Sequence, residues 1–133
     1  MVAPMLVLDQ PVPRLGQATT TVRGVTHAFL EHAARIRAPA RPEYADAVLL
    51  VVIELVTNAI RHTEGPAAVH LELHEDHIEI RATDSSPAAP EPRVPRIDGS
   101  GGYGLHLIKT LTTRTRTDPT PDGGKTIYAY APW

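Results

Sequence analysis

The sequence predicts an α+β two-layer sandwich, in which a mixed, mainly antiparallel sheet carries about three helices on one face. Two observations lead to this fold class. Stretches with a helical period of three to four residues stand beside stretches whose apolar residues recur at every second position. The predicted strands also come in runs, which disfavours a doubly wound parallel sheet. At 133 residues the chain suits a single domain, 1–133, with one core.

The first part of the chain predicts one short strand and two helices. Residues 5–9 read as a strand that Pro11 ends. Apolar side chains then recur at helical spacing over 21–37, with Thr21 as the expected cap. The segment 43–63 is apolar on nearly all sides in its middle, which also fits a buried strand. Its length, its proline before the start and its Gly-Pro end favour a buried helix.

The rest of the chain predicts a hairpin, a long loop, a third helix and a closing hairpin. Apolar and polar residues alternate strictly in two neighbouring segments, as in an antiparallel hairpin with one wet face. Four prolines exclude regular structure from the loop, and loops of such length inside a compact domain are usually functional lids. The expected elements are strands at 69–73 and 78–82, a lid at 85–100, a helix over about 102–113, and strands near 114–118 and 125–131.

Charge and composition exclude several classes of function. With 13 basic and 15 acidic residues the formal net charge is -2, so the bulk charge does not favour direct binding of nucleic acid or of an anionic membrane. The absence of cysteine rules out disulfides, thiolate zinc sites and thiol nucleophiles. The first residues lack a basic segment and a long apolar run, so we expect a cytoplasmic protein.

The second predicted helix carries a group of polar side chains within apolar surroundings. Glu54 and Asn58 are four residues apart, so both leave one helix face about one turn from each other. An unpaired carboxylate on a buried helix is costly, so this face is expected to line a pocket. The alternative is structural: Glu54 could pair with Arg61 or another basic residue, and Asn58 could satisfy a backbone group. The group comprises Glu54, Thr57, Asn58, Arg61 and His62.

Three glycines before the third helix form the pattern G-x-G-x-x-G, namely Gly99, Gly101 and Gly104. Such glycines let a backbone approach a phosphate and open a helix whose N-terminal amides favour an anion. A dinucleotide fold would need a strand running into them, but a proline-rich loop precedes them here. The motif set of the large protein-kinase fold is absent as well. The glycines therefore predict a phosphate site of another architecture.

Three histidines, His70, His74 and His77, lie on the wet face of the predicted hairpin. Catalytic zinc needs three convergent ligands, and solvent exposure is the more common reason for such a pattern. We therefore expect exposed histidines here, with zinc binding as the minor alternative.

Four segments together resemble, in order and spacing, the N box, G1 box, G2 box and closing strand of the GHKL ATPase superfamily, whose shared architecture is the Bergerat ATP-binding fold. The resemblance covers about residues 20–131 and is closest to the small anti-sigma-factor serine/threonine kinases. Each box alone is a weak signal, and four in order are a strong one. The segments are "ELVTNAIRH" (54–62), "ATDSSP" (82–87), "GSGGYGLHLI" (99–108) and "GGKTIYAY" (123–130).

The resemblance implies ATP and Mg²⁺ as cofactors and assigns roles to individual residues. Asn58 would supply a Mg²⁺ ligand, Glu54 would position or deprotonate the attacking hydroxyl, and Asp84 would accept from the exocyclic amine of adenine. Mg²⁺ prefers hard oxygens and is usually shared with substrate phosphates, which agrees with an asparagine oxygen acting beside a triphosphate. The further nucleotide-binding residues that it implies are Arg61, His62, Gly101, Gly102, Tyr103, Gly104, Leu105 and Thr126.

The sequence departs from the family after Asp84. Many relatives continue with Asp-x-Gly-x-Gly, whereas Ser85, Ser86 and Pro87 follow here. A rigid proline at this point bears on closure of the lid and on catalytic rate, and leaves adenine recognition by Asp84 intact.

By resemblance the expected function is a kinase that holds a sigma factor inactive and phosphorylates an anti-sigma factor antagonist, thereby regulating transcription. Homodimerisation is implied in the same way. The competing hypothesis is a catalytically weak, nucleotide-dependent protein-binding switch. A third alternative is a detached ATPase module that serves a histidine kinase in trans.

Overall fold

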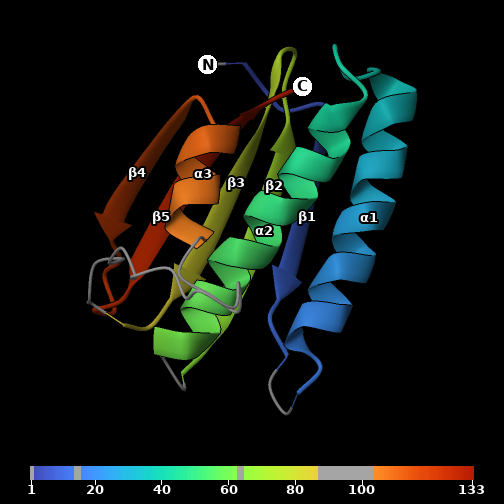
Figure 1. Cartoon of the computed structure of the whole chain (residues 1–133). Helices are drawn as coiled ribbons and strands as arrows, with labels where there is room; N and C mark the ends of the chain where they lie inside the picture. The colour runs from blue at the N-terminus through green and yellow to red at the C-terminus, as the bar shows by residue number, and fades with distance from the viewer. Residues whose placement is uncertain (1, 14–15, 63–64, 87–103) are drawn as a thin grey trace.

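The computed structural model describes residues 2–13, 16–62, 65–86 and 104–133 (Figure 1). These described residues form eight elements along the chain. They are β1 (Leu6–Pro11), α1 (Ala18–Ile36), α2 (Glu43–His62), β2 (Ala67–Leu73), β3 (His77–Asp84), α3 (Gly104–Leu111), β4 (Arg114–Pro119) and β5 (Lys125–Pro132).

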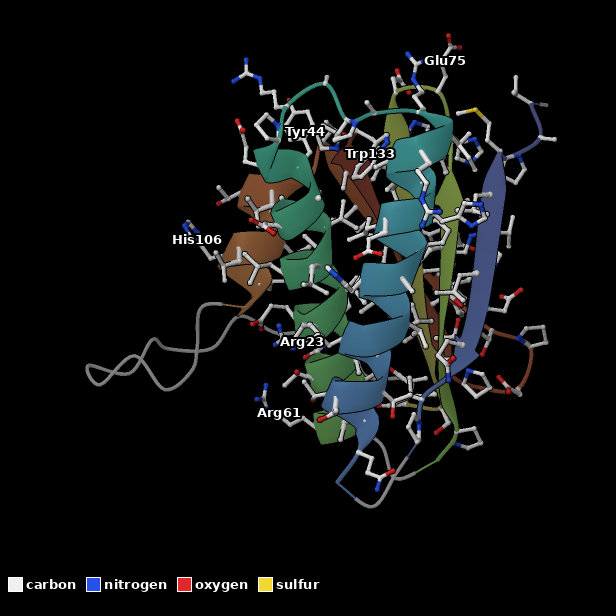
Figure 2. All side chains as sticks on the ribbon, turned by 90° about the vertical axis from the view of Figure 1, so that its right-hand side faces the viewer. Arg23, Tyr44, Arg61, Glu75, His106 and Trp133 are labelled. Atoms are coloured by element: carbon white, nitrogen blue, oxygen red, sulfur yellow. The ribbon has the colours of Figure 1, made fainter. Side chains whose placement is uncertain are left out.

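The strands form a five-stranded sheet in the order β1-β2-β3-β5-β4. Every pair of neighbours is antiparallel, so the prediction of a mixed, mainly antiparallel sheet is refined to a wholly antiparallel one among the described strands. The three helices cover one face of this sheet, and the edge-on view separates the helical layer from the sheet (Figures 1 and 2). The predicted two-layer α+β fold is therefore confirmed.

The core lies between the two layers and follows from the periods in the sequence. In β2 and β3 the apolar residues of each alternation are buried, among them Leu71, Leu73, Ile78 and Ile80. The helix α2 lies in the middle of its layer and contacts both other helices as well as β2, β3 and β5. This position explains its apolar middle, because a helix packed against a sheet and two helices needs more than one apolar stripe.

The start of α1 differs from the prediction. The helix begins at Ala18, one turn before the expected position, and Gln17 occupies the N-cap without a side-chain capping hydrogen bond. The backbone amide of Thr21 already donates to the Gln17 carbonyl, 2.9 Å away, so Thr21 lies within the helix and is not its cap. Burial of Ala18 against the core accounts for the extra turn.

The outer face of the sheet is covered by its own long side chains. The Arg116 guanidinium lies 4.1 Å from the centre of the Tyr128 ring, and that of Arg114 lies 4.3 Å from the centre of the Tyr130 ring. Cation–π contacts of this kind contribute about 0.5–1 kcal/mol at exposed sites. The two arginines of the edge strand therefore shield the aromatic residues of β5.

The end of the chain is packed against the N-terminal part of the fold. The Trp133 backbone amide donates to the Asp76 carbonyl over 3.0 Å, and its indole Nε1 donates to the Arg37 carbonyl over 2.7 Å. Trp133 is only 4% exposed. Its contacts join the last strand to the end of α1 and to the β2–β3 turn. Among the described residues, no helix is long and apolar enough to cross a membrane.

Candidate nucleotide site

Parts of four elements come together toward one end of the molecule. They are the C-terminal half of α2, the end of β3, the start of α3 and the start of β5 (Figure 1). The helix α2 contacts each of the other three elements. Most of the residues that the sequence singled out belong to these segments, so the fold gathers positions that lie up to about seventy residues apart along the chain.

Glu54 and Asn58 lie one turn apart on α2, and both are half-buried. Within the described part of the chain, neither side chain makes a hydrogen bond or an ion pair. The structural alternative for Glu54 fails, because Arg61 is exposed and points away from the sheet at the end of α2 (Figure 2). A half-buried carboxylate and a half-buried amide on one helix face, both with free hydrogen-bonding capacity, are suited to a polar ligand.

The N-terminus of α3 meets this face of α2 at Gly104. A Cβ atom at position 104 would collide with the Glu54 carboxylate, since it would lie 3.3 Å from Cδ and still closer to Oε2. Glycine at this position therefore lets the Glu54 carboxylate lie directly against the α3 backbone. The contact places an acidic side chain beside the first backbone amides of a helix, which are also the groups that favour an anionic ligand.

Asp84 ends β3 and is 3% exposed, with its side chain on the sheet face that the helices cover. Its partner in β5 is Lys125, which is also 3% exposed. The Lys125 Nζ lies 3.0 Å from each of the two carboxylate oxygens. The carboxylate expected to accept from adenine is thus already bound to a buried ammonium group.

The structure assigns Lys125, and not Thr126, to the side of the sheet on which Asp84 lies. Successive residues of a strand face opposite ways, and the Thr126 hydroxyl makes its hydrogen bond of 2.9 Å with Thr83 on the outer face. The Thr126 side chain, which the motif predicted near adenine, therefore lies on the sheet face opposite to the Asp84 side chain. Sequence reasoning missed Lys125, although Ile127 and Ala129 share its phase and predict a core-facing lysine that needs an acidic partner.

Gly124 precedes Lys125 and brings the chain against the end of β3. A Cβ atom there would lie 2.9 Å from the Ser85 Cα and closer still to the Asp84 carbonyl oxygen. Only glycine allows β5 to begin at this distance from Asp84.

The remaining predicted site residues are distributed as follows. Leu105 is half-buried in the first turn of α3, and His62 is the last residue of α2. The predictions for Gly101, Gly102 and Tyr103, and for the lid after Ser86, fall outside the described residues.

On the opposite face of the sheet, the three histidines are half-buried rather than exposed. His70 contacts Asp9 through Nδ1 at 2.5 Å and Glu72 through Nε2 at 2.7 Å. Burial acts to lower the pKa of His70, but the hydrogen bonds to Asp9 and Glu72 outweigh it and raise the pKa above its ordinary value. Burial acts to raise the pKa of Glu72. The hydrogen bonds with His70 and His74 and the positive charge of Arg81 outweigh burial, so the pKa lies below its ordinary value.

One group of side chains on this outer face has the spacing of metal ligands, namely Glu72, His74 and Glu79. The Arg81 guanidinium already compensates both carboxylates, with contacts of 3.2 Å to Glu72 and 2.5 Å to Glu79. A metal ion would have to displace this cation as well as the His74–Glu72 hydrogen bond of 2.9 Å. The arrangement therefore favours a polar network within the sheet over a zinc site.

Comparison with protein-family models bears on the family resemblance that the sequence suggested. The model of the histidine kinase-like ATPase domain matches residues 16–130. The chain therefore belongs to the histidine kinase-like ATPase family, within the GHKL superfamily whose members bind ATP.

Among solved structures, the NMR structure of the histidine kinase domain of the E. coli osmosensor EnvZ is similar, with a TM-score of 0.45 and 14% sequence identity. The alignment covers 99% of this chain and 91% of that chain. No curated protein matches the chain at a significant level.

The residues present fit a nucleotide with its metal ion at one part of the site, whereas a buried cation already occupies Asp84 at another part. Asn58 offers the oxygen ligand that Mg²⁺ prefers, and Gly104 lets the Glu54 carboxylate lie beside the N-terminus of α3. At the end of β3, Lys125 adds a positive charge to the position expected to receive the base.

Proposed function

We propose that this protein is an ATP-dependent serine/threonine protein kinase of the anti-sigma-factor type. The observation that carries the proposal is the pair of unpartnered polar side chains, Glu54 and Asn58, on the face of α2 that meets Gly104. Membership of the histidine kinase-like ATPase family supports ATP binding at this place.

The roles of the residues follow from their chemistry. When bound, ATP with Mg²⁺ would supply the electrophilic γ-phosphoryl group and neutralise its charge. The Asn58 amide oxygen would hold the metal ion, and the first amides of α3 beside Gly104 would hold phosphate oxygens. Glu54 would orient the serine hydroxyl of the protein substrate and accept its proton, while the new oxygen–phosphorus bond forms and the bond to the ADP oxygen breaks.

The partners in this proposal are a sigma factor and a small anti-sigma factor antagonist. Phosphorylation of the antagonist would stop it from releasing the sigma factor, so the ATP level and the phosphorylation state would together regulate transcription. Both partners follow from the resemblance of the four boxes to the anti-sigma kinases, and the protein would act on them as a homodimer.

A second candidate function is a nucleotide-dependent binding switch with little phosphoryl transfer. It is favoured by the departure at the end of β3, where Ser85 and Ser86 replace the family's glycine-bearing turn and Lys125 binds the Asp84 carboxylate. In this case the nucleotide would alter the protein-binding surface and would not be consumed.

The experiment that tests the proposal combines ATP labelled in its γ-phosphate, Mg²⁺ and each small antagonist-like protein of the source genome. The kinase proposal expects labelled phosphoserine on one antagonist, and no label when that serine is replaced by alanine. Nucleotide-dependent capture of a partner without any phosphoserine would replace the kinase by the switch. If ATP does not bind at all, both candidates fail.

A further inference from the structure

The Asp84–Lys125 pair is built into the start of the last hairpin. The two residues are directly opposite each other in the β3–β5 register, and their side chains are 1% and 3% exposed. The ammonium lies 3.0 Å from both carboxylate oxygens, so it holds the carboxylate at both ends. A buried pair with this geometry keeps its mutual attraction, because little water is present to screen it.

The ammonium has a second partner besides the carboxylate. Nζ donates to the Ser86 carbonyl oxygen over 3.2 Å. The Ser86 backbone amide donates in turn to the Asp84 Oδ1 atom over 2.8 Å. The serine turn that departs from the family pattern therefore contacts both members of the Asp84–Lys125 pair.

The arrangement bears directly on recognition of a base. The carboxylate accepts two hydrogen bonds at Oδ1, from the Ser86 amide and from Nζ, and Nζ also lies 3.0 Å from Oδ2. An amine donor entering the site would meet a carboxylate whose charge is already compensated. A hydrogen bond to an uncompensated carboxylate is much stronger than one to a compensated carboxylate.

We propose that Lys125 is a specificity-determining residue of the nucleotide site, which lowers the affinity for 6-aminopurine nucleotides by competing with the base for Asp84. This inference rests on the proposed function, since it requires that Asp84 receives the base. The new element is the buried ammonium group of Lys125, which competes with the base for the Asp84 carboxylate. Because the competition acts only through the 6-amino group, it applies to adenine and not to the 6-oxo base hypoxanthine.

The test measures dissociation constants of ATP and ITP, with Mg²⁺ present, for the intact chain and for Lys125→Thr and Lys125→Gln. Removal of the lysine exposes the Asp84 carboxylate to the amine, so ATP should bind roughly tenfold more tightly, the effect expected for one hydrogen bond to a charged group. ITP affinity should change little. Lys109→Gln, which removes an exposed lysine in the last turn of α3, is the control for charge and should leave both constants unchanged.

Lys125→Gln serves where Lys125→Thr fails to fold, because its amide can still donate to the buried carboxylate without carrying a charge. A rise in the ratio of ATP to ITP affinity in either variant supports the proposal. Equal changes for both nucleotides, or weaker ATP binding after removal of the lysine, would overturn it while leaving the nucleotide site in place. If no form binds any nucleotide, the proposed function itself is wrong, and this inference fails with it.

Discussion

The Glu54 carboxylate lies against the backbone of Gly104, so two helices that are distant in sequence meet at a charged side chain and a glycine. The contact links the residue proposed as the proton acceptor to the helix N-terminus proposed to hold phosphate. Any side chain at position 104 must move the carboxylate, because no other space is left for a Cβ atom.

Gly104→Ala should therefore impair phosphoryl transfer more than folding. The carboxylate is the end of a flexible side chain and can turn away, so the free energy of unfolding should change by less than about 1 kcal/mol. Displacement of a catalytic group by about 1 Å can cost on the order of a hundredfold in rate. Gly24→Ala is the control, since a Cβ there meets nothing within 4 Å and should leave the rate unaltered. A Gly104→Ala protein with full activity would contradict the placement of Glu54 in the reaction.

Replacement of Glu54 by glutamine should separate binding from turnover. A positioned general base contributes on the order of 10² to 10⁴ in rate, whereas the neutral amide keeps the size of the side chain. We expect a loss of that order in phosphorylation of the antagonist with an ATP dissociation constant changed only a few-fold. Glu75→Gln, at the exposed β2–β3 turn at the opposite end of the molecule, should change neither quantity (Figure 2). Equal losses of binding and turnover in Glu54→Gln would argue against the role.

Metal binding should require nucleotide. Asn58 provides one neutral oxygen, and Mg²⁺ retains its water unless anionic oxygens help to hold it. Calorimetry of the nucleotide-free protein with Mg²⁺ should give no measurable binding heat. With ATP present, Mg²⁺ should strengthen nucleotide binding in the intact chain and much less in Asn58→Ala. Tight Mg²⁺ binding in the absence of nucleotide would contradict the proposed site.

The buried Asp84–Lys125 pair should show strong coupling in a double-mutant cycle. Asp84→Asn or Lys125→Met alone leaves a buried charge without its partner, which costs about 3–5 kcal/mol. The double variant removes both charges, so its loss of stability should be clearly smaller than the sum of the two single losses. Urea unfolding of the four proteins measures this difference. Additive losses would mean that the two side chains do not interact.

The outer-face network predicts a stability that depends on pH. His70 has a folded-state pKa raised above 6.5, so its contribution is complete below about that pH and is lost as the pH rises through the folded pKa. Glu72 has a folded-state pKa lowered below 4.5, so its contribution is present above that pH and is lost as the pH falls through the folded pKa. The network should therefore contribute most between these limits.

The measurement is the free energy of unfolding from urea titrations between pH 5 and pH 8.5, for the intact protein and for His70→Asn. Stability of the intact protein should fall on the alkaline side, and the variant should show a flatter profile there. Asp9 and Glu72 remain in the variant, so an unchanged slope would assign the dependence to other groups.

The elements of the fold that depend on local sequence patterns were predictable, whereas those that depend on contacts between distant residues were not. The hairpin of β2 and β3 follows from a local period of two, and the burial of α2 follows from its apolar middle. The start of α1 was misplaced because burial of Ala18 outweighed the local capping preference.

The sequence indicated which residues to propose for the site better than it indicated which way their side chains face. Glu54 and Asn58 share a helix face by spacing alone, but their contact with Gly104 depends on how α3 docks on α2. The motif predicted Thr126 beside the base, whereas the register of β5 against β3 places Lys125 opposite Asp84. Pairing between strands forty residues apart is set by the whole sheet, so a local pattern cannot determine which of two neighbours faces a ligand.

The burial of Trp133 gives the protein a natural optical reporter. It is the one tryptophan in the sequence, and its indole is held by the Arg37 carbonyl at the end of the molecule opposite to Arg61 (Figure 2). Its fluorescence should follow release of the last strand from α1, so unfolding of the variants above can be recorded without a dye. In a nucleotide titration the Trp133 fluorescence should stay constant unless nucleotide binding changes the structure at the far end of the sheet, around Trp133.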